Sequence, residues 1–241
     1  MRIIVVENYE EMSKKAAMMI ASQVMLKPDS VLGLATGDTP SGMYKELILL
    51  YNKKEVDFRE VTTFNLDEYY ELNRENPQSY YSYMTNNLFN SINISKKNIN
   101  IPNGMAKDVE AVCREYEDKI KEAGGIDMQV LGIGGNGHIG FNEPDVNFEA
   151  QTHLVNLDEE TIEANSRFFD SIVDVPVKAI SMGIKTIMNS KKIILLANGI
   201  SKAGAIERAV NGKISPKVPA SILQLHNDVT LILDSEAASQ L

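Results

Sequence analysis

Cysteine, proline and positive charge are all scarce in this sequence. Cys113 is the single cysteine among 241 residues, and one thiol cannot close a disulfide within the chain. A disulfide scaffold is therefore excluded, and a reducing, cytoplasmic environment is expected. With only 8 prolines and 15 glycines, the composition also excludes collagen-like and disordered proteins. The chain is expected to fold around an ordinary hydrophobic core.

Long apolar runs are missing as well. The first run, Ile3–Val6, ends at Glu7 and is too short for the apolar part of a signal peptide. No later run approaches the ~18 residues that a membrane span requires. The 33 acidic and 24 basic residues give a net charge of −9, which repels nucleic acid and anionic lipid. We therefore expect neither as a partner, although a few local cations and backbone N–H groups can still bind a small anion.

What the sequence does contain is an alternation of short apolar runs with amphipathic stretches. This pattern predicts an α/β fold of Rossmann-like type, with a doubly wound, mostly parallel sheet and helices on both faces. No repeat or linker is visible, so we expect one domain over residues 1–241. Strands are expected at Ile3–Val6, Val31–Ala35, Thr62–Leu66, Met128–Ile133, Ala179–Met182, Lys192–Ala197 and Val229–Leu233. Helices are expected from Asn8 to Pro28 and at Pro40–Tyr51, Ser79–Leu88, Val109–Glu122, Thr161–Phe169, Ser201–Val210 and Asp234–Gln240.

In such sheets, ligands bind beyond the carboxyl ends of the strands, and the segment after the second expected strand suits an anion. Here Gly37 frees the backbone to turn, Thr39 is a candidate N-cap and Pro40 suits the first helical position. The exposed N–H groups and the hydroxyls of Thr36 and Thr39 would cradle a phosphate. A plain strand-to-helix turn fits the same residues. The glycine spacing matches neither a Walker loop nor a dinucleotide fingerprint.

Two further strand ends carry acid–base groups. Asp67 directly follows an apolar strand and precedes aromatic residues, where partial desolvation would raise its pKa and suit a proton-abstracting base. A turn or helix-cap role is the common alternative. After the fourth expected strand, five glycines in the nine residues 132–140 surround His138, as expected where backbone closely approaches a ligand. Glu143 follows at a distance suited to orienting the imidazole.

Two cations stand near other expected strand ends or turns. Arg167 lies in the segment Asn-Ser-Arg-Phe-Phe, and Lys202 follows a strand end and the turn at Gly199. Both are placed to meet an anionic ligand, although most arginines and lysines are simply solvated surface charges.

Together these segments resemble the glucosamine-6-phosphate deaminase family, nearly from end to end. The resemblance implies conversion of D-glucosamine 6-phosphate and water to D-fructose 6-phosphate and ammonia, without metal or cofactor. It also implies that the segment 157–180 acts as a lid. The matching motifs are Thr36-Gly37-Asp38-Thr39-Pro40, Phe64-Asn65-Leu66-Asp67-Glu68-Tyr69, Gly137-His138-Ile139-Gly140-Phe141-Asn142-Glu143-Pro144, Ala164-Asn165-Ser166-Arg167-Phe168-Phe169 and the region around Lys202.

The resemblance also implies a role for each candidate residue. His138 would open the sugar ring while Glu143 holds the imidazole, and Asp67 would move a proton between C2 and C1. Asn136 stands where many relatives have Asp, so it is a site residue whose role is open. The phosphate would be held by Thr36, Gly37, Thr39, Arg167 and Lys202.

Two other functions remain as alternatives. A 6-phosphogluconolactonase-type hydrolase has a similar Gly-His loop, but it would leave Asp67 without a C2 proton to abstract. A non-catalytic sugar-phosphate sensor would be expected to have lost Asp67 or His138.

Regulation and assembly are expected to differ from those of longer family members, which are hexamers activated by N-acetylglucosamine 6-phosphate. The stretch from Asp145 to Val155 contains no Arg or Lys to bind that phosphate. We therefore expect an unregulated enzyme that is a monomer or small homo-oligomer and not a hexamer.

Overall fold

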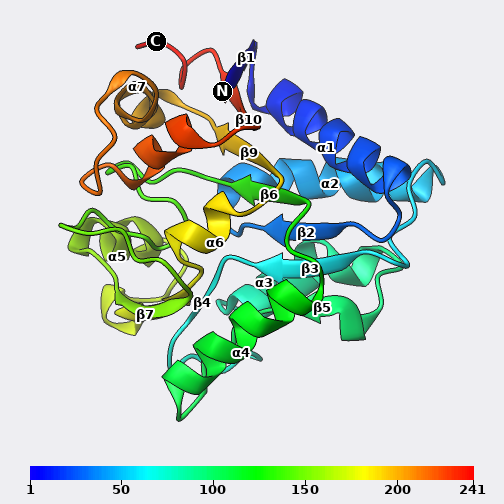
Figure 1. Ribbon diagram of the computed structural model, residues 1–241, viewed down its shortest axis with the longest axis horizontal. Helices are drawn as coiled ribbons and strands as arrows, with labels where there is room; N and C mark the ends of the chain where they lie inside the picture. The colour runs from blue at the N-terminus through cyan, green and yellow to red at the C-terminus, as the bar shows by residue number, and fades with distance from the viewer.

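The computed structural model describes residues 1–241 as two sheets with helices around them. The large sheet has seven strands in the order β1-β10-β9-β6-β2-β3-β5, all parallel, and the small sheet has the order β4-β8-β7, with antiparallel pairing. Figure 1 shows the large sheet running through the centre of the molecule. The strands are β1 Arg2–Val6, β2 Val31–Leu34, β3 Thr62–Asn65, β4 Asp67–Tyr69, β5 Ile99–Asn100, β6 Met128–Leu131, β7 His153–Asn156, β8 Lys178–Ser181, β9 Lys192–Ala197 and β10 Val229–Asp234.

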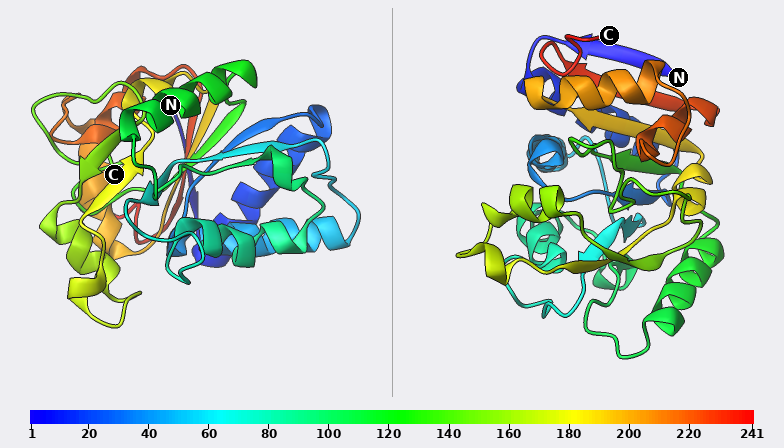
Figure 2. Two further views of the ribbon diagram at one scale, coloured as in Figure 1. Left: turned by 90° about the horizontal axis from the view of Figure 1, so that it is seen from below. Right: turned by 90° about the vertical axis from the view of Figure 1, so that its left-hand side faces the viewer.

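Helices cover both faces of the large sheet, as the edge-on view in Figure 2 shows. Helices α1, α2 and α3 pack on one face, and α4, α6 and α7 pack on the other. The α-helices are α1 Tyr9–Leu26, α2 Asp38–Asn52, α3 Tyr80–Asn87, α4 Val109–Glu122, α5 Glu159–Ser166, α6 Ile184–Met188 and α7 Ala203–Asn211. Five short 3₁₀ helices occupy Phe89–Ser91, Lys96–Asn98, Ile172–Asp174, Ile200–Lys202 and Pro219–Leu225.

Side-chain alternation along the central strands builds the two cores. In β9, Ile193 and Leu195 pack under α4, α6 and α7, while Ile194 and Leu196 pack under α1 and α2. All four are buried because successive residues of a strand point to opposite faces and both faces carry helices. The predicted α/β class, with a doubly wound and mostly parallel sheet, is confirmed.

Several boundaries and one expected helix were wrong. The expected strand Ala179–Met182 belongs to the small antiparallel sheet, as β8, where it pairs with β4 and β7. Strands β4, β5 and β7 were not expected, because none of them consists of a continuous run of apolar residues. Of the expected helix Asp234–Gln240, Asp234 is the last residue of β10, and residues 235–240 form successive turns instead of a helix. The carboxylate of Asp234 accepts the backbone N–H groups of Gly199 and Ala237 and so ties these turns to the segment after β9.

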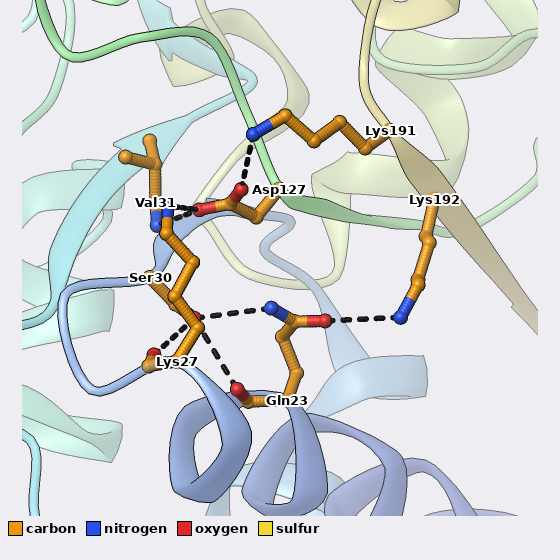
Figure 3. Close-up of polar contacts among 7 residues, drawn as sticks. All are labelled: Gln23, Lys27, Ser30, Val31, Asp127, Lys191 and Lys192. Carbon is orange, nitrogen blue, oxygen red and sulfur yellow. Dashed lines mark hydrogen bonds and ion pairs between the residues drawn. The ribbon is translucent and has the colours of Figure 1, made fainter.

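The amino ends of three central strands meet at one buried carboxylate, far along the strands from their carboxyl ends. Asp127, directly before β6, accepts hydrogen bonds from the backbone N–H of Val31 in β2 and from the ammonium groups of Lys27 and Lys191. Figure 3 shows the two lysines reaching it from opposite sides. Although burial acts to raise it, these hydrogen bonds lower the pKa of Asp127. The carboxylate therefore stays charged and ties these strand ends together.

Candidate active site

A cavity of about 680 Å³ opens at the carboxyl edge of the large sheet. It is bordered by the segments after β2, β3, β6 and β9 and by α5. The chain passes from β2 to β3 on one side and from β6 to β9 on the other, so the cavity lies at the switch point where parallel sheets bind ligands. Of the predicted site residues, Glu143 alone does not line it.

Asp67 lies at the floor of this cavity as the first residue of β4. One residue, Leu66, separates it from β3, and its side chain is almost wholly buried. Burial, together with the charge of the neighbouring Glu68, raises the pKa of Asp67 to about 8. No protein donor hydrogen-bonds its carboxylate, so both oxygens are free to accept a proton. Burial, and to a lesser extent the charge of Asp67, raises the pKa of the phenols of Tyr44, Tyr69, Tyr80 and Tyr116.

Glu68, the neighbour of Asp67 in β4, links this strand to the start of α3. Its carboxylate accepts three backbone N–H bonds of 2.9 Å, from Tyr69 and from Tyr80 and Tyr81 at the start of α3. These bonds satisfy a carboxylate that is 2% exposed and fix the amino end of α3 against β4. Tyr80 is thereby held at the cavity wall. This role could not be predicted from the sequence, because the start of α3 is twelve residues from Glu68.

The glycine-rich segment after β6 holds His138 close to the backbone. A Cβ atom on Gly134 would lie 2.4 Å from the imidazole, and Gly137 has φ +96°, a conformation that other residues rarely adopt. Nδ1 of His138 lies 3.0 Å from Oε2 of Glu143. The glycines predicted backbone that approaches a ligand closely or takes a positive φ; in the structure Gly134 lies against the imidazole of His138, and Gly137 and Gly140 take positive φ.

Both carboxylate oxygens of Glu143 accept hydrogen bonds. Its Oε2 also accepts Nδ2 of Asn136 at 2.9 Å, and its Oε1 accepts the hydroxyl of Thr161 at 2.6 Å. Although burial acts to raise it, the hydrogen bonds and charge of His138, with those two further donors, lower the pKa of Glu143 to about 2. The carboxylate is therefore charged at any pH at which the protein works.

Asn136 connects this pair to α5. Its Oδ1 accepts the backbone N–H of His138 at 3.1 Å, and its Nδ2 is 3.4 Å from Oδ2 of Asp158. Thr161 and Asp158 were not among the predicted residues, since they lie 18 and 22 positions from the groups they contact. No local pattern marks such contacts in the sequence.

The turn after β2 departs from its predicted geometry. Helix α2 begins at Asp38 with Gly37 as its N-cap, so Thr39 is not the cap and Pro40 is the third helical residue. The physical reason is the φ of +96° at Gly37, which turns the chain two residues earlier than expected. The hydroxyl of Tyr83 donates to the carbonyl oxygen of Gly37 and holds this turn. Thr39 instead donates to Oδ1 of Asn198 at 3.0 Å.

Two cations face this turn. Arg167, at the end of α5, forms a 2.8 Å ion pair with Asp38, and both side chains are more than 60% exposed. Lys202 follows β9 and has no carboxylate partner. Burial, and then the charge of Arg167, lower the pKa of Lys202. Arg167 and Lys202 both line the cavity, so each can make a charge-assisted contact with a bound anion.

No group of three or more His, Cys, Asp or Glu side chains is arranged to hold a metal ion. None of the helices combines the length and apolar character that crossing a membrane requires.

The arrangement defines an α/β enzyme that moves protons on a small anionic molecule. One cavity is lined by Asp67, whose pKa is about 8, by His138, which pairs with the charged Glu143, and by the cations Arg167 and Lys202. A family model for glucosamine-6-phosphate isomerases/6-phosphogluconolactonase matches residues 7–232. The chain belongs to this family.

Curated relatives narrow the comparison. A glucosamine-6-phosphate deaminase of Clostridium botulinum (strain Langeland) is 71% identical over 241 residues, covering 100% of this chain and 99% of the relative. A glucosamine-6-phosphate deaminase of Clostridium acetobutylicum is 66% identical over 241 residues, covering 100% of both chains. The resemblance noted in the sequence is confirmed.

Solved structures agree with the sequence matches. A monomeric glucosamine-6-phosphate deaminase superposes with a TM-score of 0.98 at 49% identity, covering 100% of both chains. A 6-phosphogluconolactonase from Leishmania guyanensis gives a TM-score of 0.76 at 21% identity, covering 100% of this chain and 98% of the other. At that identity the second match shows a shared fold alone.

Proposed function

We propose that this protein converts D-glucosamine 6-phosphate and water to D-fructose 6-phosphate and ammonia. The observation that carries the proposal is the free, buried carboxylate of Asp67 in the same cavity as His138, whose imidazole Glu143 holds from outside the cavity. This combination supplies a base for carbon and a proton shuttle for oxygen. The full-length similarity to deaminases supports the same reaction.

The phosphate of the substrate binds between the turn at Gly37 and the two cations. Thr36, Gly37 and Thr39, around the start of α2, line the cavity, and backbone N–H groups at a helix start suit phosphate oxygens. Arg167 exchanges its exposed partner, Asp38, for the phosphate. Lys202 gains a counter-ion and regains a more ordinary pKa. Binding energy from this end positions the reacting carbons over Asp67.

Ring opening is assigned to His138. With Nδ1 bonded to Glu143, the neutral ring carries its proton there, and Nε2 is the nitrogen without a protein partner. The imidazole takes the proton of the C1 hydroxyl and delivers a proton to the ring oxygen. The bond between C1 and the ring oxygen then breaks and leaves an open-chain amino aldehyde. Glu143 stabilises the transient imidazolium, and Asn136 holds Glu143 without adding charge.

Isomerisation and deamination are assigned to Asp67. Its carboxylate removes the C2 proton to give an enolamine and returns a proton to C1, which gives an imine at C2. Because C1 and C2 are adjacent, one carboxylate serves both positions. Water adds to the imine and ammonia leaves, which yields fructose 6-phosphate. Burial favours this step, since a raised pKa makes Asp67 a stronger base.

The same proposal includes one domain over residues 1–241, with the segment 157–180 as a lid. Helix α5 in this segment lines the cavity through Glu160, Thr161 and Arg167, so its displacement would open the site. A monomer is proposed for the assembly, because the 49% identical structural relative is monomeric.

The test is incubation with glucosamine 6-phosphate while ammonia and fructose 6-phosphate are followed separately. We expect equal amounts of both products, at a rate unchanged by prior treatment with a chelator. Hydrolysis of 6-phosphogluconolactone without ammonia release would make the protein a lactonase. Saturable binding of the amino sugar phosphate without turnover would make it a sensor.

A further inference from the structure

Two side chains at the start of α5 contact Glu143 and Asn136, the residues that hold His138. Thr161, which is 5% exposed, donates its hydroxyl to Oε1 of Glu143 at 2.6 Å. Oδ2 of Asp158 lies 3.4 Å from Nδ2 of Asn136. These contacts join α5 to the far side of the carboxylate and amide that hold His138.

Neither contact is a by-product of helix formation. Asp158 is the N-cap residue of α5, where an aspartate ordinarily accepts the N–H of the second or third helical residue. Its side chain makes no such bond and points to Asn136 instead. Thr161, three residues further on, likewise uses its hydroxyl on Glu143 and not on the helix backbone. Both side chains therefore bond to the Asn136–Glu143 pair and not to the backbone of their own helix.

The contacts fix how Glu143 and Asn136 are oriented. Oε2 of Glu143 already accepts two hydrogen bonds, from His138 and Asn136, so Thr161 provides the donor for Oε1. Asn136 directs its amide nitrogen to the two carboxylates and its oxygen to the backbone N–H of His138. Burial, and then the charge of Glu143, raise the pKa of Asp158, which agrees with two carboxylates sharing one amide.

The opposite end of α5 reaches the phosphate-binding turn. Arg167, the C-cap residue of α5, pairs with Asp38 at the start of α2. One short helix therefore touches the ring-opening groups at its first turn and the phosphate cradle at its end. Its placement over the cavity decides whether both sets of contacts are made.

We propose that Asp158 and Thr161 are positioning residues for ring opening, which hold Asn136 and Glu143 against His138 when α5 covers the cavity. The inference rests on the proposed deaminase function. It assigns the two residues to the first chemical step and not to proton transfer at carbon. Their loss should therefore slow ring opening and leave the Asp67 step intact.

The test compares Thr161→Val and Asp158→Ala with Thr161→Ser, which keeps the hydroxyl, and with Glu159→Ala. Glu159 is the exposed neighbouring acid of the same turn. Each variant is assayed with glucosamine 6-phosphate carrying either protium or deuterium at C2. A misplaced catalytic group typically costs on the order of 10²-fold, so we expect kcat about 10- to 100-fold lower for Thr161→Val and Asp158→Ala. Their deuterium isotope effect should be close to one, because ring opening then limits the rate.

Thr161→Ser and Glu159→Ala should keep the parent rate. The inhibition constant of fructose 6-phosphate, measured on every variant, reports whether the folded site still binds the phosphate. An unchanged kcat in Thr161→Val and Asp158→Ala would overturn the proposal. So would a lower kcat with a full isotope effect, since the slow step would then lie at C2. If the parent enzyme released no ammonia at all, the proposed function itself would fail, and the parent assay alone would reveal this.

Discussion

Nδ1 of His138 and Oε2 of Glu143 lie 3.0 Å apart, and the carboxylate in this pair has a pKa of about 2. Glu143 is thus a fixed negative charge beside an imidazole throughout the neutral range. Such a charge orients the ring, favours the tautomer with the proton on Nδ1 and stabilises an imidazolium when Nε2 takes up a proton. This contact is therefore the basis for assigning proton transfer at the ring oxygen of the sugar to His138.

Replacing His138 with Gln tests that assignment. Glutamine fills similar space but cannot shuttle a proton, so we expect kcat to fall ~10²–10⁴-fold with the cyclic substrate. An open-chain substrate analogue bypasses ring opening and should be affected far less. Turnover of the two substrates by parent and variant measures the difference. Equal losses with both would remove His138 from ring opening.

Asp67→Asn should remove the base at carbon and keep the fold. We expect ammonia release to fall ~10²–10⁴-fold and solvent exchange of the C2 proton to be lost in parallel. In the parent, activity should rise with pH up to about 8, because the carboxylate is the active form and its pKa is about 8. Asp118→Asn, an exposed helix position, is the control. Exchange that persists in Asp67→Asn would place the base elsewhere.

The same Asp67→Asn variant should be more stable than the parent in alkali. The pKa of Asp67 rises from 3.8 to about 8 on folding, so between these values the native state binds more protons than the unfolded state. Stability therefore falls as pH rises through this range, and the buried charge costs most above about 8. Thermal unfolding should show the Tm of the variant exceeding that of the parent at pH 8.5, with the two converging near pH 4. A parent that is more stable at pH 8.5 would contradict the burial of a charged Asp67.

Lys202→Ala and Arg167→Ala should weaken recognition of the substrate phosphate. Each removes a charge-assisted contact to an anion, so KM should rise more than kcat falls. The advantage of glucosamine 6-phosphate over unphosphorylated glucosamine should shrink in both variants. Lys213→Ala, an exposed lysine outside the cavity, should behave as the parent does. Unchanged discrimination in both cavity variants would locate the phosphate elsewhere.

Asp127→Asn should lower stability without changing KM. The side chain is 4% exposed and pairs with Lys27 and Lys191, and loss of its charge should cost about 1–3 kcal/mol. Since folding lowers the pKa of Asp127 below 3.8, the contribution is complete above that value and is lost as pH falls through the lower, folded pKa. Urea unfolding at pH 7 and pH 3 would show a large difference from the parent at pH 7 and a smaller one at pH 3. Asp29→Asn, an exposed acid near the same strand ends, is the comparison.

The enzyme should not respond to N-acetylglucosamine 6-phosphate as an activator. The segment after Glu143-Pro144 contains no Arg or Lys before Val155, and the 270 Å³ cavity there is lined by Asp145, Glu149 and Asp158. Carboxylates repel a phosphate, so the differential affinity that activation requires is missing. Saturation curves with and without the ligand should both be hyperbolic, with at most weak competition. A sigmoidal curve made hyperbolic by the ligand would show that this segment binds it after all.

The sequence by itself determined the class of fold and predicted the residues to which the proposed chemistry is assigned. Apolar runs of four to six residues between amphipathic stretches suffice to predict parallel strands, because strands buried on both faces need continuous apolar sequence. Asp67, His138 and Lys202 were predicted because each follows such a run, and parallel topology brings all carboxyl ends to one edge. The crowding of glycines around His138 predicted unusual backbone, and Gly137 and Gly140 take positive φ, whereas the contact of Gly134 with the imidazole is known only from the structure.

Only the tertiary structure decided which residues complete the site. Glu68 binds the start of α3, and Asp158 and Thr161 hold Asn136 and Glu143, through contacts between segments that are 12 to 22 residues apart. Such contacts depend on where whole elements pack, which no local pattern encodes. The raised pKa of Asp67 has the same origin, because burial by surrounding segments fixes its value. The residue types therefore supplied the chemistry, and packing set their orientation and charge.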